Sequence, residues 1–357
     1  MAGLLRVPAA PEAIERVATP LAAAAWEAIA SGLEDASAQH RVAAEHGRSI
    51  TRQTRLATLH FQLGEMAEAR RGYEAARAAL AAVPRAAAFD ARTRQRSWGL
   101  MPAGDALATL EATLGFVETG AFPVRAPGDD DLDAEYVAGL LGAAHELSRY
   151  ATRRATAGDG ASVGVCRDGV AALQAAFLAF DFRNGPLRRK YDGLKYALCR
   201  LEDVLYELSL GGGAAPPPDG AAAAQPCLAS LEAVRARMEA SDAARELVIK
   251  RSRDVQKGAK QAIFACHRGD AAKAAALLDA AAAAATEILQ DPALVAKWPA
   301  LRGGALGAAL EESPGPASLF FSPTGGLSSL SGTRRRGSSR CGSRTARSRR
   351  ATRSACR

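Results

Sequence analysis

The sequence predicts an all-α protein, and three observations carry that prediction. Hydrophobic residues make up 48% of the 357 residues but aromatic residues only 5%, and much of the apolar content is Ala, which favours closely packed helices. Apolar residues recur at helical spacing over long stretches. Clusters of Gly, Pro and Asp separate these stretches.

These clusters, together with changes in composition, divide the chain into five parts. Residues 1–25 form an N-terminal extension, residues 26–211 one helical domain, and residues 212–225 a linker of Gly, Pro and Ala. Helical patterning resumes over residues 226–312, whereas residues 313–357 are rich in Gly, Ser and Arg, lack apolar periodicity and are expected to be disordered. Since 357 residues suffice for two compact domains, or for one domain and an accessory segment, both arrangements stay open.

The clearest helix in the sequence runs from Leu187 to Leu208. Its apolar residues alternate spacings of four and three, a 3.5-residue repeat that requires a long partner helix. A second helix spans roughly residues 134–155, where Gly139 and Gly142 allow close backbone approach. The core of any helical bundle would present the same two stripes, so they do not by themselves define a function.

The second helical part of the chain repeats the pattern of the first at a constant offset. We therefore interpret residues 226–312 as a partial second copy, although Ala-rich helices can mimic such a repeat. The matching positions are Arg48 and Arg253, Ile50 and Val255, Ala57 and Ala262, Gly64 and Gly269, and Tyr73 and Leu278.

The basic character of the chain resides in its C-terminal segment. The net charge is +8, but residues 333–357 hold ten Arg and no Asp or Glu, which leaves 8 − 10 = −2 for the rest. Two interpretations stay open. A reading-frame shift after Glu312 would turn GC-rich codons for an Ala, Glu and Leu helix into Arg, Ser, Pro, Gly and Cys; alternatively, the segment is an Arg-rich nucleic-acid-binding arm. If another reading frame of the gene encodes the motifs of a continued helix, the reading-frame shift is the correct interpretation.

Cysteine placement and the N-terminal sequence bear on the compartment. The six cysteines are scattered without a close pair, so neither a zinc cluster nor a disulfide framework is indicated. The Ala-rich stretch from Leu21 to Ala25 is too short for a membrane span or a signal peptide. We expect a cytoplasmic protein, with the nucleus as a second location and an organellar transit peptide left open.

Three motifs carry a family resemblance. Residues 146–149 are Glu-Leu-Ser-Arg, residues 156–159 are Thr-Ala-Gly-Asp, and residues 190–196 are Lys-Tyr-Asp-Gly-Leu-Lys-Tyr. Their order and spacing resemble the translin family. The third motif resembles the translin branch rather than the sister branch, translin-associated factor X. The resemblance covers residues 40–211 and, weakly, 240–312.

The resemblance implies a bundle of about seven helices that assembles into a hollow, roughly octameric shell and binds single-stranded RNA or DNA inside it. The implied partners are therefore single-stranded nucleic acid, further copies of the chain and a factor X-like subunit, with no membrane. In this family, mixed shells with factor X are metal-dependent endoribonucleases.

The resemblance also implies an incomplete catalytic and metal site. The active subunit of the family carries Glu-x-x-Glu on one helix and Asp-x-x-x-Glu on another, a set of carboxylates suited to Mg²⁺ or Mn²⁺. Carried over, the pattern places carboxylates at Glu111 and Glu146, whereas Ala108 and Gly142 stand where the other two belong. Two carboxylates would hold a metal ion weakly, so we expect this chain to be a poor nuclease.

Arginines are the candidate nucleic-acid contacts. Arg92, Arg94 and Arg96 precede Trp98, in the region that matches a basic segment of the family, and guanidinium groups suit phosphate recognition. A solvated helix face is the alternative for this run. Arg149 could instead form an ion pair with Glu146 or Asp192. The weaker candidates are Arg149, Arg188 and Arg189.

We rank three hypotheses. The first is a single-stranded nucleic-acid-binding subunit of an oligomeric translin-like complex. The second is a metal-dependent endoribonuclease that uses Glu111, Glu146 and either Glu135 or Glu202. The third is a helical module that only oligomerises. The sequence contains no nucleophile triad, phosphate-binding loop or dinucleotide-binding glycine pattern.

Overall fold

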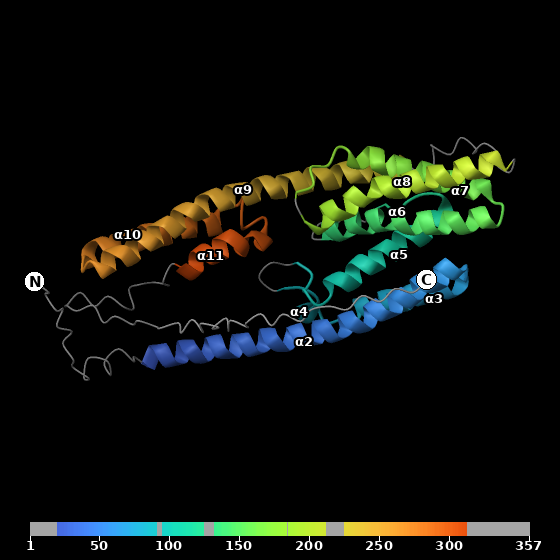
Figure 1. Cartoon of the computed structure of the whole chain (residues 1–357). Helices are drawn as coiled ribbons and strands as arrows, with labels where there is room; N and C mark the ends of the chain where they lie inside the picture. Colours follow the sequence, from blue (N-terminus) through green and yellow to red (C-terminus); the bar gives the residue numbers. More distant parts are fainter. Residues whose placement is uncertain (1–19, 91–94, 125–131, 184, 212–224, 313–357) are drawn as a thin grey trace, which may run out of the picture.

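The computed structural model describes residues 20–90, 95–124, 132–183, 185–211 and 225–312 (Figure 1). Within these ranges the chain forms ten α-helices and one 3₁₀ helix, and the only β-type pairing is an isolated bridge between Phe89 and Arg96. The all-α prediction is confirmed. None of the described helices is both long enough and apolar enough to cross a membrane.

The N-terminal helices build the first core. They are α2 (Pro20–Leu63), α3 (Met66–Ala81), α4 (Arg85–Ala88) and α5 (Met101–Thr119). A tight turn at Gly64, whose φ of +89° suits glycine, reverses the chain from α2 to α3. The core side chains come from the C-terminal half of α2 and from α3 to α5, because residues 27–42 of α2 are exposed without exception.

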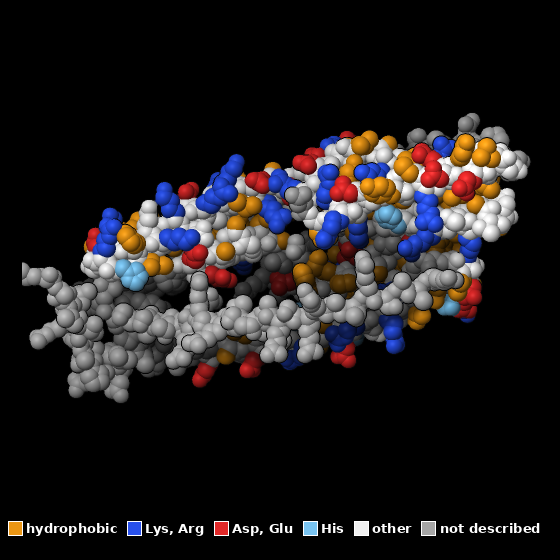
Figure 2. Space-filling view, viewed as in Figure 1, with side chains coloured by type: hydrophobic (Ala, Val, Ile, Leu, Met, Phe, Trp, Pro, Cys, Tyr) orange, Lys and Arg blue, Asp and Glu red, His pale blue; other side chains and the backbone are white. Residues whose placement is uncertain are grey.

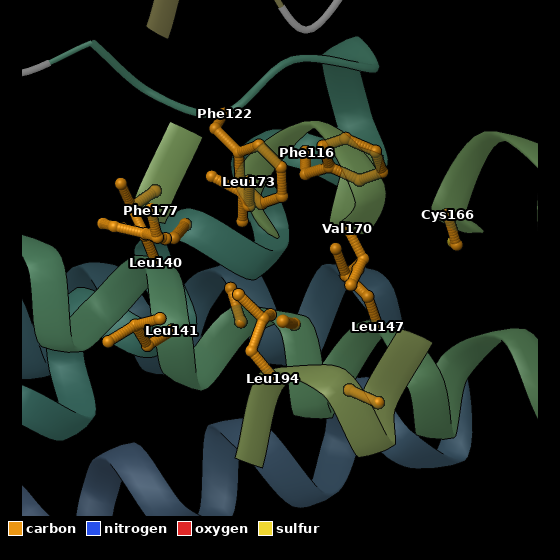
Figure 3. Packing of buried hydrophobic residues seen from close by; sticks show 14 of the residues in the cluster. Phe116, Phe122, Leu140, Leu141, Leu147, Cys166, Val170, Leu173, Phe177 and Leu194 are labelled. Carbon is orange, nitrogen blue, oxygen red and sulfur yellow. The ribbon is translucent and has the colours of Figure 1, made fainter. Parts of the chain in front are cut away.

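Three further helices build the second core. They are α6 (Asp133–Thr156), α7 (Gly160–Phe177) and α8 (Pro186–Leu210), and α5 also contributes (Figure 3). The predicted helices at 134–155 and 187–208 agree with α6 and α8. The long partner that the 3.5-residue repeat of α8 requires is supplied by α6 and α7 together, since both pack along it.

Glycines set the distance between α5 and α6. A Cβ atom on Gly139 would lie 2.8 Å from the backbone of Ala108, and a Cβ atom on Gly142 would collide with the side chain of Thr109. The expectation that these two glycines allow close backbone approach is therefore confirmed. Ala108 and Gly142, where the family pattern has carboxylates, both lie in this close helix contact.

The remaining helices form a third core beyond the second one. They are α9 (Gln225–His267), α10 (Ala271–Gln290), the 3₁₀ helix η3 (Pro299–Arg302) and α11 (Gly304–Glu312). Figure 1 shows α9 leaving the bundle of α6, α7 and α8 and continuing to α10 and α11. The third core is made by α9, α10, α11 and the connection before η3.

The N-terminal part of α9 is joined to the second core. Leu231 and Val234 are buried in that core. Arg237 donates two hydrogen bonds to the carboxylate of Asp133 at the start of α6, at 2.8 and 2.9 Å. Arg183, before α8, pairs with carboxylates of α9. One continuous helix thus connects the second and third cores.

The helix pairs α2–α3 and α9–α10 have the same local plan. Each is a helix of more than 40 residues, a turn with a positive-φ glycine, an acidic residue and a shorter antiparallel helix. The glycines are Gly64 and Gly269, with φ of +89° and +79°. The interpretation of residues 226–312 as a second copy, and the domain limits, stay predictions. Of the predicted linker, residues 212–225, Gln225 is the first residue of α9 and residues 212–224 lie outside the described residues, as do residues 1–19 and 313–357.

Candidate nucleic-acid interface

The Glu-Leu-Ser-Arg motif joins α6 to α2. The Oε2 atom of Glu146 accepts a hydrogen bond of 2.8 Å from Gln62 on α2, and its Oε1 atom accepts one of 3.3 Å from Arg149. Leu147 and Ser148 between them are buried. Of the two ion pairs considered for Arg149, the one with Glu146 is therefore confirmed.

The Thr-Ala-Gly-Asp motif forms the turn between α6 and α7. Gly158 adopts a φ of +78° after the last turn of α6. Asp159 is the N-cap of α7: it accepts hydrogen bonds from the backbone and hydroxyl of Ser162, at 3.0 and 2.6 Å, and from Arg154 at 2.9 Å. These bonds, first those from Ser162, lower the pKa of Asp159 to about 2. The motif therefore caps a helix.

The Tyr-Asp-Gly-Leu motif packs α8 against α6. Gly193 faces the imidazole of His145, and a Cβ atom on it would lie 2.8 Å from Nε2. Leu194 is buried in the second core, and the ring of Tyr191 contacts that of Phe182 at 5.1 Å between centroids. Burial of His145 between the helices lowers its pKa. The most family-specific motif is thus a packing motif.

The two predicted metal ligands have separate partners. Glu111 lies on the exposed side of α5, close to the hydroxyl of Tyr73, and burial together with the charge of Glu111 raises the pKa of Tyr73 to about 12. Glu146 is held by Gln62 and Arg149. In the described ranges, no three His, Cys, Asp or Glu side chains come together as a metal ion would require. The metal site stays a prediction.

The other two acidic candidates are also placed apart. Glu135, in the first turn of α6, accepts hydrogen bonds of 2.7 and 3.2 Å from Arg96. Glu202 is exposed on α8. The acidic candidates therefore lie on different faces or are already paired.

The predicted arginine run before Trp98 is only partly within the described residues. Arg92 and Arg94 lie outside them. The side chain of Arg96 is only 10% exposed, because it pairs with Glu135 and covers the ring of Phe89 at 5.5 Å. It fixes the segment before α5 to α6. Trp98 is 78% exposed, which makes it available for base stacking.

The other predicted arginines line the exposed sides of α6 and α8. The side chain of Arg149 is 61% exposed although it pairs with Glu146. Arg188 pairs with Asp192 at 3.0 Å, and Arg189 is exposed in the first turn of α8. Figure 2 shows Lys and Arg side chains interleaved with Asp and Glu over these helices. Exposed pairs of this kind are worth at most about 1 kcal/mol, so a phosphate group can compete for the cations.

Two exposed tyrosines on α8 were not among the sequence candidates. Tyr196 is 67% exposed and Tyr206 65%, and the ammonium of Lys195 lies 4.9 Å from the ring centroid of Tyr196. Both positions fall off the apolar stripe of α8. The heptad pattern therefore contained the signal that these rings face solvent, and it could have identified them as stacking candidates.

Together the fold and the motifs define a class: an all-α bundle protein whose motifs serve helix capping and helix packing. The translin family model matches residues 111–212, which contain the end of α5, α6 to α8 and all three motifs. This part of the chain is similar to the translin family, and the resemblance seen in the sequence is confirmed there.

Similar proteins lead to the same family. Translin of Gallus gallus is 39% identical over 82 residues, which are 23% of this chain and 36% of that protein. The translins of Homo sapiens and Mus musculus are each 37% identical over 109 residues, 30% of this chain and 46% of theirs. The chain thus spans less than half the length of these relatives.

Proposed function

We propose that this chain binds single-stranded RNA or DNA as a subunit of a self-associating, translin-like assembly. The observation that carries the proposal is the translin-family segment, residues 111–212, folded with all three of its motifs in capping and packing roles. Because the motifs serve the fold, binding falls to side chains that the fold leaves exposed.

Cations and aromatic rings would share that binding. Arg149 and Arg189 on α6 and α8 offer guanidinium groups to phosphates, and phosphate contacts make affinity depend on salt concentration. Trp98 offers an exposed ring on which a base can stack without regard to its identity. The proposal therefore predicts a preference for single strands over duplexes.

Titration of a fluorescein-labelled 20-nucleotide single strand against the full chain, followed by fluorescence anisotropy across a KCl series, tests this proposal. The double variant Arg149→Ser and Arg189→Ser should reduce the slope of log affinity against log salt by about 0.7 for each phosphate that is no longer neutralised. Trp98→Ala should weaken binding about fivefold or more. The matched control replaces two exposed arginines on α3, Arg71→Ser and Arg77→Ser. Since every variant retains the C-terminal arginines, equal slopes for the double variant and the control would refute the proposed role of Arg149 and Arg189.

We further propose that RNA cleavage belongs to a factor X-like partner rather than to this chain. Support comes from Ala108 and Gly142 in the tight contact of α5 with α6, and from the separate partners of Glu111 and Glu146. The full chain incubated with single-stranded RNA and Mg²⁺ or Mn²⁺ should leave the RNA intact. Cleavage that Glu146→Ala abolishes would contradict this assignment.

Self-association is supported by exposed apolar residues on α2. Leu56, Leu59 and Leu63 are 52%, 48% and 62% exposed, and Ile29 and Leu33 add exposed apolar side chains toward the N-terminal end of the helix. A run of exposed leucines on one helix is typical of a surface that another protein chain covers.

A further inference from the structure

A basic groove lies between α9 and α10, away from the candidate interface on α6 and α8. Its volume is about 680 Å³. Five of its side chains are cationic and one is a carboxylate. The charged and aromatic residues that line the groove are Arg253, Lys257, Lys260, Phe264, Arg268, Asp270 and Lys273.

The positive charge of this groove is largely unbalanced. Its carboxylate, Asp270, caps α10 by accepting the backbone N–H of Lys273 at 3.1 Å. Lys260 pairs with Glu312 at 3.3 Å. Over the described parts of the chain, no carboxylate lies within ion-pair distance of Arg253, Lys257 or the ammonium group of Lys273. Like charges gathered in one cleft attract a polyanion, and Figure 2 shows this gathering of Lys and Arg along α9 and α10.

An exposed aromatic ring lies in the same groove. Phe264 is 57% exposed, and the guanidinium carbon of Arg268 lies 4.2 Å from its ring centroid. A phenyl face beside an arginine is the combination on which unpaired bases stack. A duplex keeps its bases stacked inside, so the ring favours a single strand.

Comparison with α2 argues against a protein helix as the occupant. At the constant offset of the internal repeat, Leu56, Leu59 and Leu63 correspond to Gln261, Phe264 and Arg268. The face that is leucine-rich and exposed on α2 is thus polar, aromatic and basic on α9. The C-terminal arginines of this chain carry the same charge as the groove, which disfavours them as its occupant.

We propose that the groove between α9 and α10 is a second binding site for single-stranded nucleic acid. Arg253, Lys257 and Lys273 contact successive phosphates, and Phe264 stacks on a base between them. This site uses other helices than the interface proposed above, so either site can bind without the other.

Binding of a fluorescein-labelled 12-nucleotide oligouridine to the full chain across a KCl series tests the site. Lys257→Ser with Lys273→Ser should lower the slope of log affinity against log salt by about 1.4, which is about 0.7 for each phosphate that is no longer neutralised. Phe264→Ala should weaken binding about fivefold or more, and Phe264→Trp should restore it. Arg245→Ser with Lys250→Ser is the matched control, since both cations lie exposed on α9 but outside the groove.

Ultraviolet cross-linking separates this site from the interface on α6 and α8. We expect the oligouridine to attach to the tryptic peptide of residues 261–268 in the unaltered chain and in the Arg149→Ser, Arg189→Ser variant. The proposal is overturned if the groove variants bind like the control pair, if no adduct forms on that peptide, or if a duplex competes as well as a single strand. If only the Arg149→Ser, Arg189→Ser variant fails to change the salt dependence of binding, that result counts against the function proposed above and not against the groove.

Discussion

Gly193 shows how a single position can be family-specific without taking part in chemistry. The imidazole of His145 fills the space that a side chain at this position would need. The neighbouring Leu194 is 1% exposed in the second core, so α8 cannot rotate to relieve a clash. The Asp-Gly pair in the motif therefore marks a close approach of α6 and α8.

Replacement of Gly193 by Ala should consequently destabilise the protein. Overpacking of this kind costs about 1–3 kcal/mol, which exceeds the gain in helix propensity of about 1 kcal/mol. Urea unfolding followed by circular dichroism measures the difference. Gly32→Ala on α2 is the control, because a Cβ atom there meets nothing within 4 Å and should stabilise the helix. A Gly193→Ala protein as stable as the Gly32→Ala protein would contradict the packing role.

Asp159 gives the turn between α6 and α7 a pH dependence. Its pKa falls from the ordinary 3.8 to about 2, first because Ser162 donates hydrogen bonds to the carboxylate. The folded state thus holds this proton less tightly than the unfolded state, so the stabilisation is complete above about pH 4 and lost as the pH falls toward 2.

Asp159→Ala should therefore cost about 0.5–2 kcal/mol at pH 7, the value of a lost N-cap, and much less near pH 2. Thermal unfolding of both proteins at several pH values checks this prediction. Asp279→Ala, at an exposed position of α10, should show no such change with pH. An equal cost of the Asp159 substitution at pH 7 and pH 2 would mean that the cap does not depend on the ionised carboxylate.

At the scale of elements, α9 connects two cores because Arg237, in its N-terminal part, is tied to Asp133 of α6. The side chain of Asp133 is only 9% exposed, and that of Arg237 is 31% exposed. Two charge-assisted hydrogen bonds in such surroundings are stronger than bonds between exposed groups. Leu231 and Val234 of α9 add apolar contacts with the second core.

Arg237→Ala should loosen this end of α9 and leave the third core intact. We expect faster amide hydrogen exchange in residues 230–240, by about tenfold or more, because a hydrogen bond to a charged group contributes about 1.5–3 kcal/mol. Exchange in residues 255–265 should stay unchanged. Arg245→Ala, at an exposed position of the same helix, is the control. Uniform acceleration along α9 would show that the helix unfolds as one unit.

Helices and contacts that depend on residues close together in the sequence could be predicted, whereas contacts between residues remote in the sequence could not. The stripe of α8 and the glycines of α6 were readable because helix periodicity and close approach depend on residues a few positions apart. The pairing of Arg96 with Glu135 was not readable, because it joins residues that only the packing of α6 beside the segment before α5 brings together. In the candidate interface, Arg96 therefore has a structural role, and Trp98 is the exposed side chain of that segment.

At the scale of the whole molecule, the exposed face of α2 is a long surface that this chain leaves open in the described ranges. Its residues 27–42 are all exposed, and the leucines at its C-terminal end are about half exposed or more. Each methylene group that is removed from water contributes about 0.8 kcal/mol, so association of two such faces would be favourable.

Light scattering with mass determination should therefore give a mass well above the 37.1 kDa of one chain. Leu56→Glu with Leu59→Glu should shift the mass toward one chain, because two carboxylates would be buried in the contact. Ala75→Glu with Ala78→Glu, at exposed positions of α3, should leave it unchanged. If the α2 and α3 double variants have the same mass, the contact between chains does not lie on this face of α2.

The sequence by itself determined the helical class, the positions of α6 and α8, and the three family motifs. These follow from backbone hydrogen bonding and apolar periodicity, which act over a few residues. Only the tertiary structure decided what the motifs do and which charges remain available. Glu146 and Arg237 find their partners on helices remote in sequence, whereas Lys257 and Lys273 line one groove in which no carboxylate of the described residues pairs with either. Charge pairing depends on distance in space, and that distance exists only once the cores have packed.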